Sequence, residues 1–160
     1  MRMKKYQKTN TLIPSYKKYS APSVSIPLEL VKLEDNSFHL LVKVEIDRIQ
    51  GDMIIDTGAS VTVVDQKIFA HIIDAAKEVK MQSGSVSGQI NDVQLIKAKE
   101  LKIGGRKIRN IQLAALDLDY VNEMYHNHLQ RKIIGLLGCD FCVKYKAVID
   151  YRTRELSISK

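Results

Sequence analysis

The sequence has few of the residues and patterns on which several classes of protein depend. Its 160 residues include two cysteines, too few for the disulfide framework of a small secreted protein. No segment approaches the roughly 18 consecutive apolar residues of a membrane-spanning helix. The basic N-terminus is not followed by the apolar core of a secretory signal. We therefore expect a cytoplasmic protein with no membrane partner.

Acidic residues are missing from the first 20 positions, and this accounts for most of the net charge of +7. Six basic residues lie there: Arg2, Lys4, Lys5, Lys8, Lys17 and Lys18. The rest of the chain holds 19 basic and 18 acidic residues and is nearly neutral. Residues 1–22 also lack the apolar residues of a core, which predicts a flexible basic arm. A nucleic-acid contact is expected only through this arm, and a solvated tail is its ordinary interpretation.

Residues 23–160 are long enough to bury a core as one domain. Alternation of apolar and polar residues predicts that strands dominate this domain. The expected strands cover residues 24–33, 38–47, 52–55, 61–64, 93–103, 108–116, 133–137, 147–151 and 155–159. Between them, Arg48 to Gly51 is expected to turn, Gly104-Gly105 predicts one hairpin, and Arg152-Thr153 predicts another. Pro27 places the first strand at the edge of a sheet.

Helical spacing of apolar residues is confined to two longer segments. The first, over residues 66–76, follows Asp65 as its N-cap. The second, over residues 119–130, has apolar residues at the i, i+3, i+4 and i+7 positions of one face. A third, short helix is expected after Gly138.

The most informative stretch is Met53–Ser60, which reads MIIDTGAS. Its apolar residues are typical of the end of a buried strand, and they lead directly into Asp56. A carboxylate in that place must be paired or hydrogen-bonded. Gly58 permits a tight turn, and the small residues that follow leave space beside the carboxylate. The stretch therefore predicts a strand, a tight loop and a second strand. An ordinary turn in which Asp56 caps its own backbone fits the same three letters.

Two later stretches complete the pattern. The first combines glycine and serine around one valine: Gly84, Ser85, Val86, Ser87 and Gly88. It is typical of a mobile hairpin tip, and the absence of a following lysine argues against a phosphate loop. The second ends a buried strand at a glycine and contains Leu136, Leu137, Gly138 and Asp140.

Taken in this order, the three stretches resemble the catalytic loop, the flap and the apolar-apolar-glycine signature of retropepsin-like aspartic proteases. The likeness is to the single-lobe bacterial and cellular branch, over roughly residues 24–158. It implies an all-β acid-protease fold, a closed barrel lobe with two or three short helices. It also implies that Asp56 is catalytic, that Thr57, Gly58, Ala59 and Ser60 form the active-site loop, and that residues 84–88 cover the substrate. Leu136, Leu137, Gly138 and Asp140 would be the structural signature.

The chain differs from retroviral enzymes at two positions. Those enzymes carry an acidic residue after Asp-Thr-Gly-Ala and an arginine after the later glycine. Here the positions hold Ser60 and Cys139, so both members of that ion pair are missing together. A retroviral substrate preference is therefore not expected.

The chemistry that the resemblance implies needs two carboxylates sharing one proton, because two like charges so close cannot both be ionised comfortably. The sequence has one Asp-Thr-Gly and no Asp-Ser-Gly. The second carboxylate must then come from another copy on a two-fold axis. We expect a homodimeric aspartic endopeptidase that binds a peptide or protein in extended conformation and uses no cofactor. The alternative is a retropepsin-like module that binds peptides or dimerises without cleaving.

Metal or redox chemistry has weaker support. Cys139 and Cys142 supply two of the four ligands of a structural zinc site, and the sequence around them lacks the strand-helix-strand pattern of thioredoxin-like proteins. They are expected to be two small buried thiols. His126 and His128, two apart on a helix, point in different directions. No metal site is therefore expected.

Overall fold

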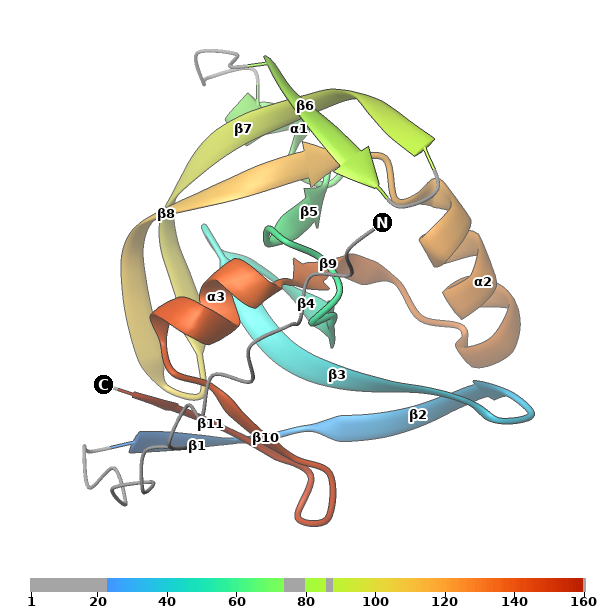
Figure 1. The fold of residues 1–160 in the computed structure, drawn as a ribbon, viewed down its shortest axis with the longest axis vertical. Coiled ribbons are helices and arrows are strands. Elements are labelled where there is room, and N and C mark those ends of the chain that lie inside the picture. The colour runs from blue at the N-terminus through green and yellow to red at the C-terminus, as the bar shows by residue number, and fades with distance from the viewer. Residues whose placement is uncertain (1–22, 74–79, 86–87, 160) are drawn as a thin grey trace, which may run out of the picture.

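The computed structural model describes residues 23–73, 80–85 and 88–159, and strands dominate them (Figure 1). The strands are β1 (Ser23–Pro27), β2 (Glu29–Glu34), β3 (Ser37–Ile46), β4 (Ile49–Ile55), β5 (Val63–Asp65), β6 (Lys80–Ser85), β7 (Gly88–Ile103), β8 (Arg106–Leu116), β9 (Ile133–Leu137), β10 (Val148–Asp150) and β11 (Glu155–Ser159). The helices are α1 (Ala70–Ile73), α2 (Asp119–Leu129) and α3 (Cys139–Lys144). The predicted all-β class with short helices is confirmed. No helix of the described residues combines the length and apolar character needed to cross a membrane.

Six strands close into a barrel in the order β3-β4-β9-β5-β8-β7. Closure occurs where the end of β7 pairs antiparallel with the end of β3, with Ile103 opposite Val44 and Leu101 opposite Ile46. Strands β2 and β6 extend the sheet beyond β3 and β7. The predicted closed barrel is therefore confirmed.

The long β7–β8 hairpin turns where the sequence predicted. Gly104 and Gly105 both have positive φ angles, 54° and 78°, which glycine adopts without strain. Within β7, the inward alternation shifts between Ala98 and Leu101. At this point the carboxylate of Asp47 accepts hydrogen bonds from the amides of Lys99, at 3.0 Å, and Glu100, at 2.8 Å. The β3–β4 turn thus fixes β7 just before the residues that pair with β3 and close the barrel.

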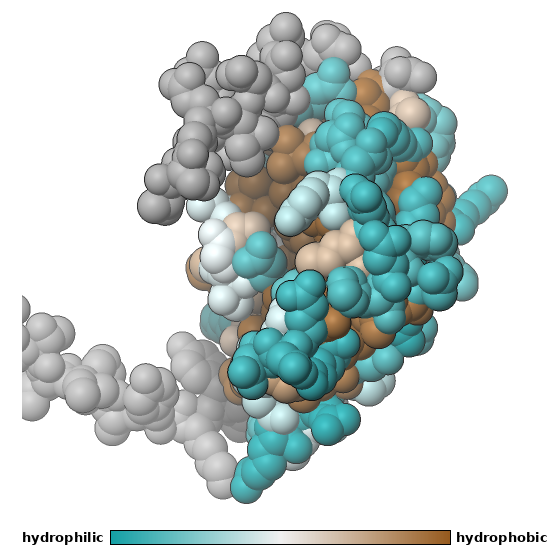
Figure 2. Space-filling view, turned by 90° about the vertical axis from the view of Figure 1, so that its right-hand side faces the viewer, coloured by the Kyte–Doolittle hydropathy of each residue, from teal (hydrophilic) through white to brown (hydrophobic). Residues whose placement is uncertain are grey.

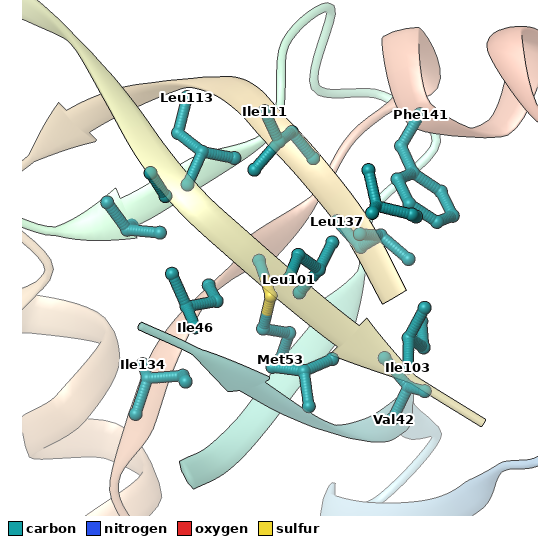
Figure 3. Packing of buried hydrophobic residues seen from close by; sticks show 14 of the residues in the cluster. Val42, Ile46, Met53, Leu101, Ile103, Ile111, Leu113, Ile134, Leu137 and Phe141 are labelled. Carbon is teal, nitrogen blue, oxygen red and sulfur yellow. The ribbon is translucent and has the colours of Figure 1, made fainter. Parts of the chain in front are cut away.

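The barrel is filled by side chains rather than open. Figure 3 shows residues from β3, β4, β7, β8 and β9 meeting inside it, with Phe141 of α3 added at one end. Ile46, Met53, Leu101 and Leu137 are at most 1% exposed. Burial of this apolar surface is the main stabilising contribution of the fold.

Helix α2 packs outside the barrel, and its Asn122 side chain makes three hydrogen bonds that attach it there. The Asn122 amide group donates to the Asp65 carboxylate, at 3.0 Å, and to the Ile133 carbonyl, at 3.1 Å. Its oxygen accepts from the Ile133 amide at 2.7 Å. Beneath the helix, Tyr125 is fully buried and shares a 2.7 Å hydrogen bond with His39. Burial raises the pKa of the Tyr125 hydroxyl, so it stays protonated.

The prediction of one strand over residues 24–33 is wrong. The chain changes sheets at Leu28, so β1 pairs with β11 in a three-stranded sheet while β2 pairs with β3. The Leu28 amide donates to the Arg154 carbonyl at 2.8 Å, which continues the β1–β11 register by one residue, and the pairing with β3 begins at Glu29. The β10–β11 hairpin around Arg152-Thr153 is confirmed.

Other boundaries also differ from the prediction, including the start of β7 at Gly88 rather than at residue 93. Within the described residues, the helix expected over 66–76 begins only at Ala70 of α1, because residues 66–69 form a turn whose amides at Lys67 and Ile68 are capped by the buried Asp65 carboxylate. The strand expected over 61–64 begins at Val63, and the turn expected over 48–51 is limited to Asp47-Arg48. Residues 74–76 of the expected helix, and the predicted arm over 1–22, lie outside the described residues.

Candidate active site

The loop that carries Asp56 joins two strands on opposite sides of β9. Strand β4 pairs parallel with β9, and β5 pairs antiparallel with it. The connection between β4 and β5 must therefore pass over the end of β9. The Asp56 amide donates to the Leu137 carbonyl at 3.0 Å, which continues the β4–β9 pairing up to the carboxylate. This topology places Asp56 at the end of a buried strand, as the sequence predicted.

The Asp56 carboxylate is held by the backbone of its own loop. Its Oδ1 accepts hydrogen bonds from the amides of Gly58, at 2.9 Å, and Ala59, at 3.2 Å. A Cβ atom on residue 58 would lie 3.2 Å from Oδ1, so glycine leaves this oxygen uncrowded. The self-capping expected of an ordinary turn is therefore present. It fixes one carboxylate oxygen, while Oδ2 has no hydrogen-bond partner in the described residues.

The rest of the loop is open to solvent. Thr57, Gly58 and Ser60 are exposed, and Ala59 and Asp56 are half-buried. Beside the loop lies a depression of about 480 Å³, lined by Thr57, Gly58, Ser60, Cys139, Asp140, Val143 and Lys144. Val143 of α3 is 71% exposed there. An apolar side chain this exposed next to the loop marks a surface suited to contact with another chain.

The structure brings the predicted glycine signature, residues 136–140, against the Asp56 loop. The Cys139 amide donates to the Ala59 carbonyl at 2.8 Å, and Leu137 is buried in the barrel core while Leu136 is half-buried. A Cβ atom at position 138 would lie 2.5 Å from the carbonyl carbon and oxygen of Val61, so only glycine fits between loop and helix. Asp140 opens α3, and its Oδ1 accepts from the Phe141 amide at 2.7 Å.

Sequence reasoning did not single out Thr62, which is 1% exposed. Its hydroxyl accepts from the Gly138 amide at 3.1 Å and donates to Asp140 Oδ1 at 2.7 Å. The available signal was a hydroxyl inside the apolar run Val61-Thr62-Val63-Val64, where a buried polar side chain needs a partner. That run instead predicted a plain strand.

Gly84, Ser85 and Gly88 of the predicted flap lie at the end of the β6–β7 hairpin. Gly84 pairs with Gln89, and Ser85 pairs with Gly88. Val86 and Ser87 lie outside the described residues. In Figure 2 the side nearest the viewer in Figure 1 lies at the left-hand edge, where brown and pale residues gather, whereas teal residues cover most of the right-hand part. The role of residues 84–88 as a substrate-covering flap stays a prediction.

The two cysteines are half-buried, so the prediction of buried thiols is wrong in degree. Helix α3 is short and lies at the surface, so it leaves both partly accessible. Burial raises the pKa of the Cys142 thiol, and the nearby Cys139 and Asp140 add to this. Among the described residues, no three His, Cys, Asp or Glu side chains are grouped as metal ligands.

A hollow of about 1260 Å³, larger than the depression beside the Asp56 loop, lies elsewhere on the molecule. The β3–β4 turn, α1 and the β7–β8 hairpin surround it, and none of the residues that line it belongs to the loop. Acidic and basic side chains are mixed along its walls, including Lys102 paired with Glu45 and Glu100. Size alone therefore does not locate the candidate site.

Comparison with known proteins agrees with this geometry. The family model described as Aspartyl protease matches residues 42–141, which is more than half of the chain. The chain therefore belongs to the aspartyl protease family, and its fold is retropepsin-like. No curated protein sequence matches it significantly.

Two solved structures illustrate the shared fold. A retropepsin-like aspartic protease from Rickettsia conorii is 19% identical, with a TM-score of 0.56, and the match covers 86% of this chain and 90% of that one. The retroviral protease-like domain of Ddi1 from Leishmania major is 14% identical, with a TM-score of 0.54, over 75% of this chain and 87% of that one. At these identities the likeness establishes the fold alone.

Proposed function

We propose that the chain is one subunit of a homodimeric aspartic endopeptidase in which Asp56 is the catalytic residue. The observation that carries the proposal is the placement of this carboxylate. It lies at the end of a buried strand, is fixed by the amides of Gly58 and Ala59, and is surrounded by exposed loop residues. A carboxylate fixed in this way is prepared for chemistry before a substrate arrives.

The reaction assigns a different task to each of two carboxylates. One, ionised, accepts a proton from the attacking water, while the other, protonated, donates a hydrogen bond to the scissile carbonyl. A single carboxylate cannot be ionised and protonated at once. Because the sequence supplies one such loop, the proposed second carboxylate is Asp56 of a second copy.

The surface around the loop supports an interface between copies. Thr57 and Gly58 are exposed beside the depression that also contains Val143. On neighbouring β10, Val148 is 62% exposed. Burial of these apolar side chains by a second copy would stabilise a dimer while bringing the two loops together.

The proposed substrate is a peptide or protein segment in extended conformation. Strand β6 pairs only with β7 in the described sheet, and the hairpin that they form ends at Ser85 and Gly88. We assign residues 84–88 to a flap that closes over the bound segment, excludes water and contributes backbone hydrogen bonds.

The test is a peptide-library digest at several pH values, with wild type beside Asp56→Asn. The expected result is cleavage by wild type and a loss of about a thousandfold or more in the variant, because asparagine cannot accept the proton of the water. Asp35→Asn is the matched control, since Asp35 is exposed in the β2–β3 turn and pairs only with Lys32 in the described residues.

Retained turnover in Asp56→Asn would contradict the mechanism. If wild type cleaves nothing at any pH but binds peptides from the same library, the chain is instead a non-cleaving peptide-binding module. Equal folding of the two variants, measured by circular dichroism, makes these results interpretable.

A further inference from the structure

We infer that Thr62 and Asp140 are positioning residues that clamp the exit of the Asp56 loop onto the start of α3. Neither residue is assigned contact with substrate. The effect of the clamp on turnover rests on the proposed function, whereas the clamp itself is a property of the fold and is tested separately below.

The Thr62 hydroxyl is fixed on both sides. It accepts a hydrogen bond from the Gly138 amide at 3.1 Å and donates one to Asp140 Oδ1 at 2.7 Å. With the residue 1% exposed, no water replaces either partner without a cost. Threonine is also stiff about χ1, so holding its hydroxyl holds the backbone of residue 62.

The Asp140 side chain is fixed in turn by the helix it opens. Its Oδ1 accepts from the Phe141 amide at 2.7 Å as well as from Thr62. Phe141 is 3% exposed and packs into the barrel core (Figure 3). The clamp therefore connects the loop to a part of the molecule that cannot move without disturbing the core. Asp140 itself is exposed, so the order of its carboxylate depends on these two hydrogen bonds.

Two backbone hydrogen bonds attach the entry and the middle of the loop to the segment 137–139. The entry is fixed by the Asp56 amide on the Leu137 carbonyl, and the middle by the Cys139 amide on the Ala59 carbonyl. At the exit, the Thr62 carbonyl accepts from the Ala114 amide of β8 at 2.9 Å, whereas the link from Thr62 to α3 runs through the side chains of Thr62 and Asp140. A single substitution can therefore release the link to α3 while the bond to β8 remains. A catalytic group displaced by about 1 Å loses up to about a hundredfold in rate.

A simpler role for Thr62 is to satisfy the buried Gly138 amide and nothing more. The two roles differ in what they require of Asp140. Removal of the Asp140 side chain leaves the bond between Thr62 and Gly138 in place but breaks the clamp. Under the simpler role such a variant keeps full activity.

The test compares four variants of the full chain: Thr62→Val, Thr62→Ser, Asp140→Ala and Asp140→Asn. Valine keeps the shape of threonine without its hydroxyl, whereas serine keeps the hydroxyl. Asparagine keeps an oxygen that accepts from both Thr62 and Phe141. We expect kcat to fall by about ten- to a hundredfold in Thr62→Val and Asp140→Ala, with KM nearly unchanged, and both conservative variants to remain near wild type.

The double variant Thr62→Val with Asp140→Ala is expected to be no slower than Thr62→Val alone, because both changes break one interaction. Fully multiplicative losses would contradict a shared clamp. Sedimentation of each variant at the assay concentration controls for loss of assembly.

A readout independent of turnover is amide hydrogen exchange. In Asp140→Ala, the amides of Ala59 and Cys139 are expected to exchange at least about tenfold faster, while those of the β7–β8 ladder are unchanged. The matched control is Ile46→Val, a small loss in the barrel core that lowers global stability without touching the loop.

Unchanged exchange at Ala59 and Cys139, or an equal increase in Ile46→Val, would overturn the clamp. If wild type cleaves no peptide but Asp140→Ala loosens these amides, the clamp stands and the proposed protease function fails. If wild type cleaves and Asp140→Ala matches it in both kcat and exchange, the function stands and the clamp fails.

Discussion

The β7–β8 side of the barrel and the Asp56 loop are held together by different interactions. Strands β7 and β8 share a ladder that runs from Gln94 to Ile103, and β7 turns apolar side chains such as Ala98, Leu101 and Ile103 into the core. The loop has little apolar burial and depends on a few hydrogen bonds to β9 and α3. Apolar burial in the barrel therefore accounts for most of the stability, whereas the hydrogen bonds of the loop fix the position of Asp56. Substitutions in the two regions should separate these quantities.

The largest effect on stability is expected in the barrel. Leu101→Ala removes a fully buried side chain between β7 and β3 and should lower the free energy of unfolding by about 2–5 kcal/mol. Urea denaturation followed by circular dichroism measures this. Ile103→Val in the same strand is the control, at about 0.5–1.5 kcal/mol. A cost for Leu101→Ala no greater than that control would contradict the account of the barrel.

A smaller loss of stability but a large loss of activity is expected at the loop. Gly138→Ala places a methyl group 2.5 Å from the Val61 carbonyl, so the loop or α3 must shift. We expect about 1–3 kcal/mol of destabilisation and a disproportionate fall in kcat.

Gly105→Ala is the matched glycine control. A Cβ atom there meets nothing within 4 Å, but its φ of 78° makes alanine strained by about 1–2 kcal/mol. Stability should fall while kcat is retained. Equal kcat in the two glycine variants would show that the space at Gly138 has no bearing on the site.

Asn122→Ala tests how α2 is attached to the barrel. It removes the amide that bonds Asp65 and both backbone groups of Ile133, and we expect a cost of about 1–3 kcal/mol. Exchange of the α2 amides should rise more than that of β7 and β8. Uniform acceleration across the chain would mean that α2 unfolds only together with the barrel.

The smallest effect is expected at the β10–β11 turn. The amides of Thr153 and Arg152 donate to the Asp150 carboxylate and hold its pKa below the ordinary range. A lowered pKa contributes stability above the pKa of the unfolded chain, and the contribution is lost as pH falls through the folded value.

Asp150→Asn keeps an acceptor oxygen without the charge, so it isolates this contribution. Its Tm should lie slightly below that of wild type at pH 7, and the difference should shrink as the pH falls below about 4. A difference that is constant with pH would exclude the charge as its cause.

The sequence predicted the regular strands well because a two-residue period records which face is buried. Strands β3, β8 and β11 begin and end within two residues of their predicted limits. The helix after Asp65 was overestimated because the spacing of Ile68, Phe69, Ile72 and Ile73 fits a turn and one helical turn equally well. The break at Leu28 separates strands whose partners, β11 and β3, lie in different sheets, which no local pattern records.

The candidate site was predictable where a position tolerates one kind of residue. Asp56 and Gly138 are examples, since a carboxylate at the end of an apolar strand and a glycine between packed segments can be recognised in the sequence. The contact of Thr62 with Asp140 joins residues 78 positions apart, so it became visible only in the fold.

The central claim is that two copies of this chain share one pair of carboxylates. It is tested most directly by mixing wild type with Asp56→Asn in equal amounts, at a fixed total concentration, after subunit exchange. If each active unit needs both Asp56 side chains, activity should fall to about a quarter of that of wild type alone. A fall to only about half, as for independent subunits, would contradict the shared site.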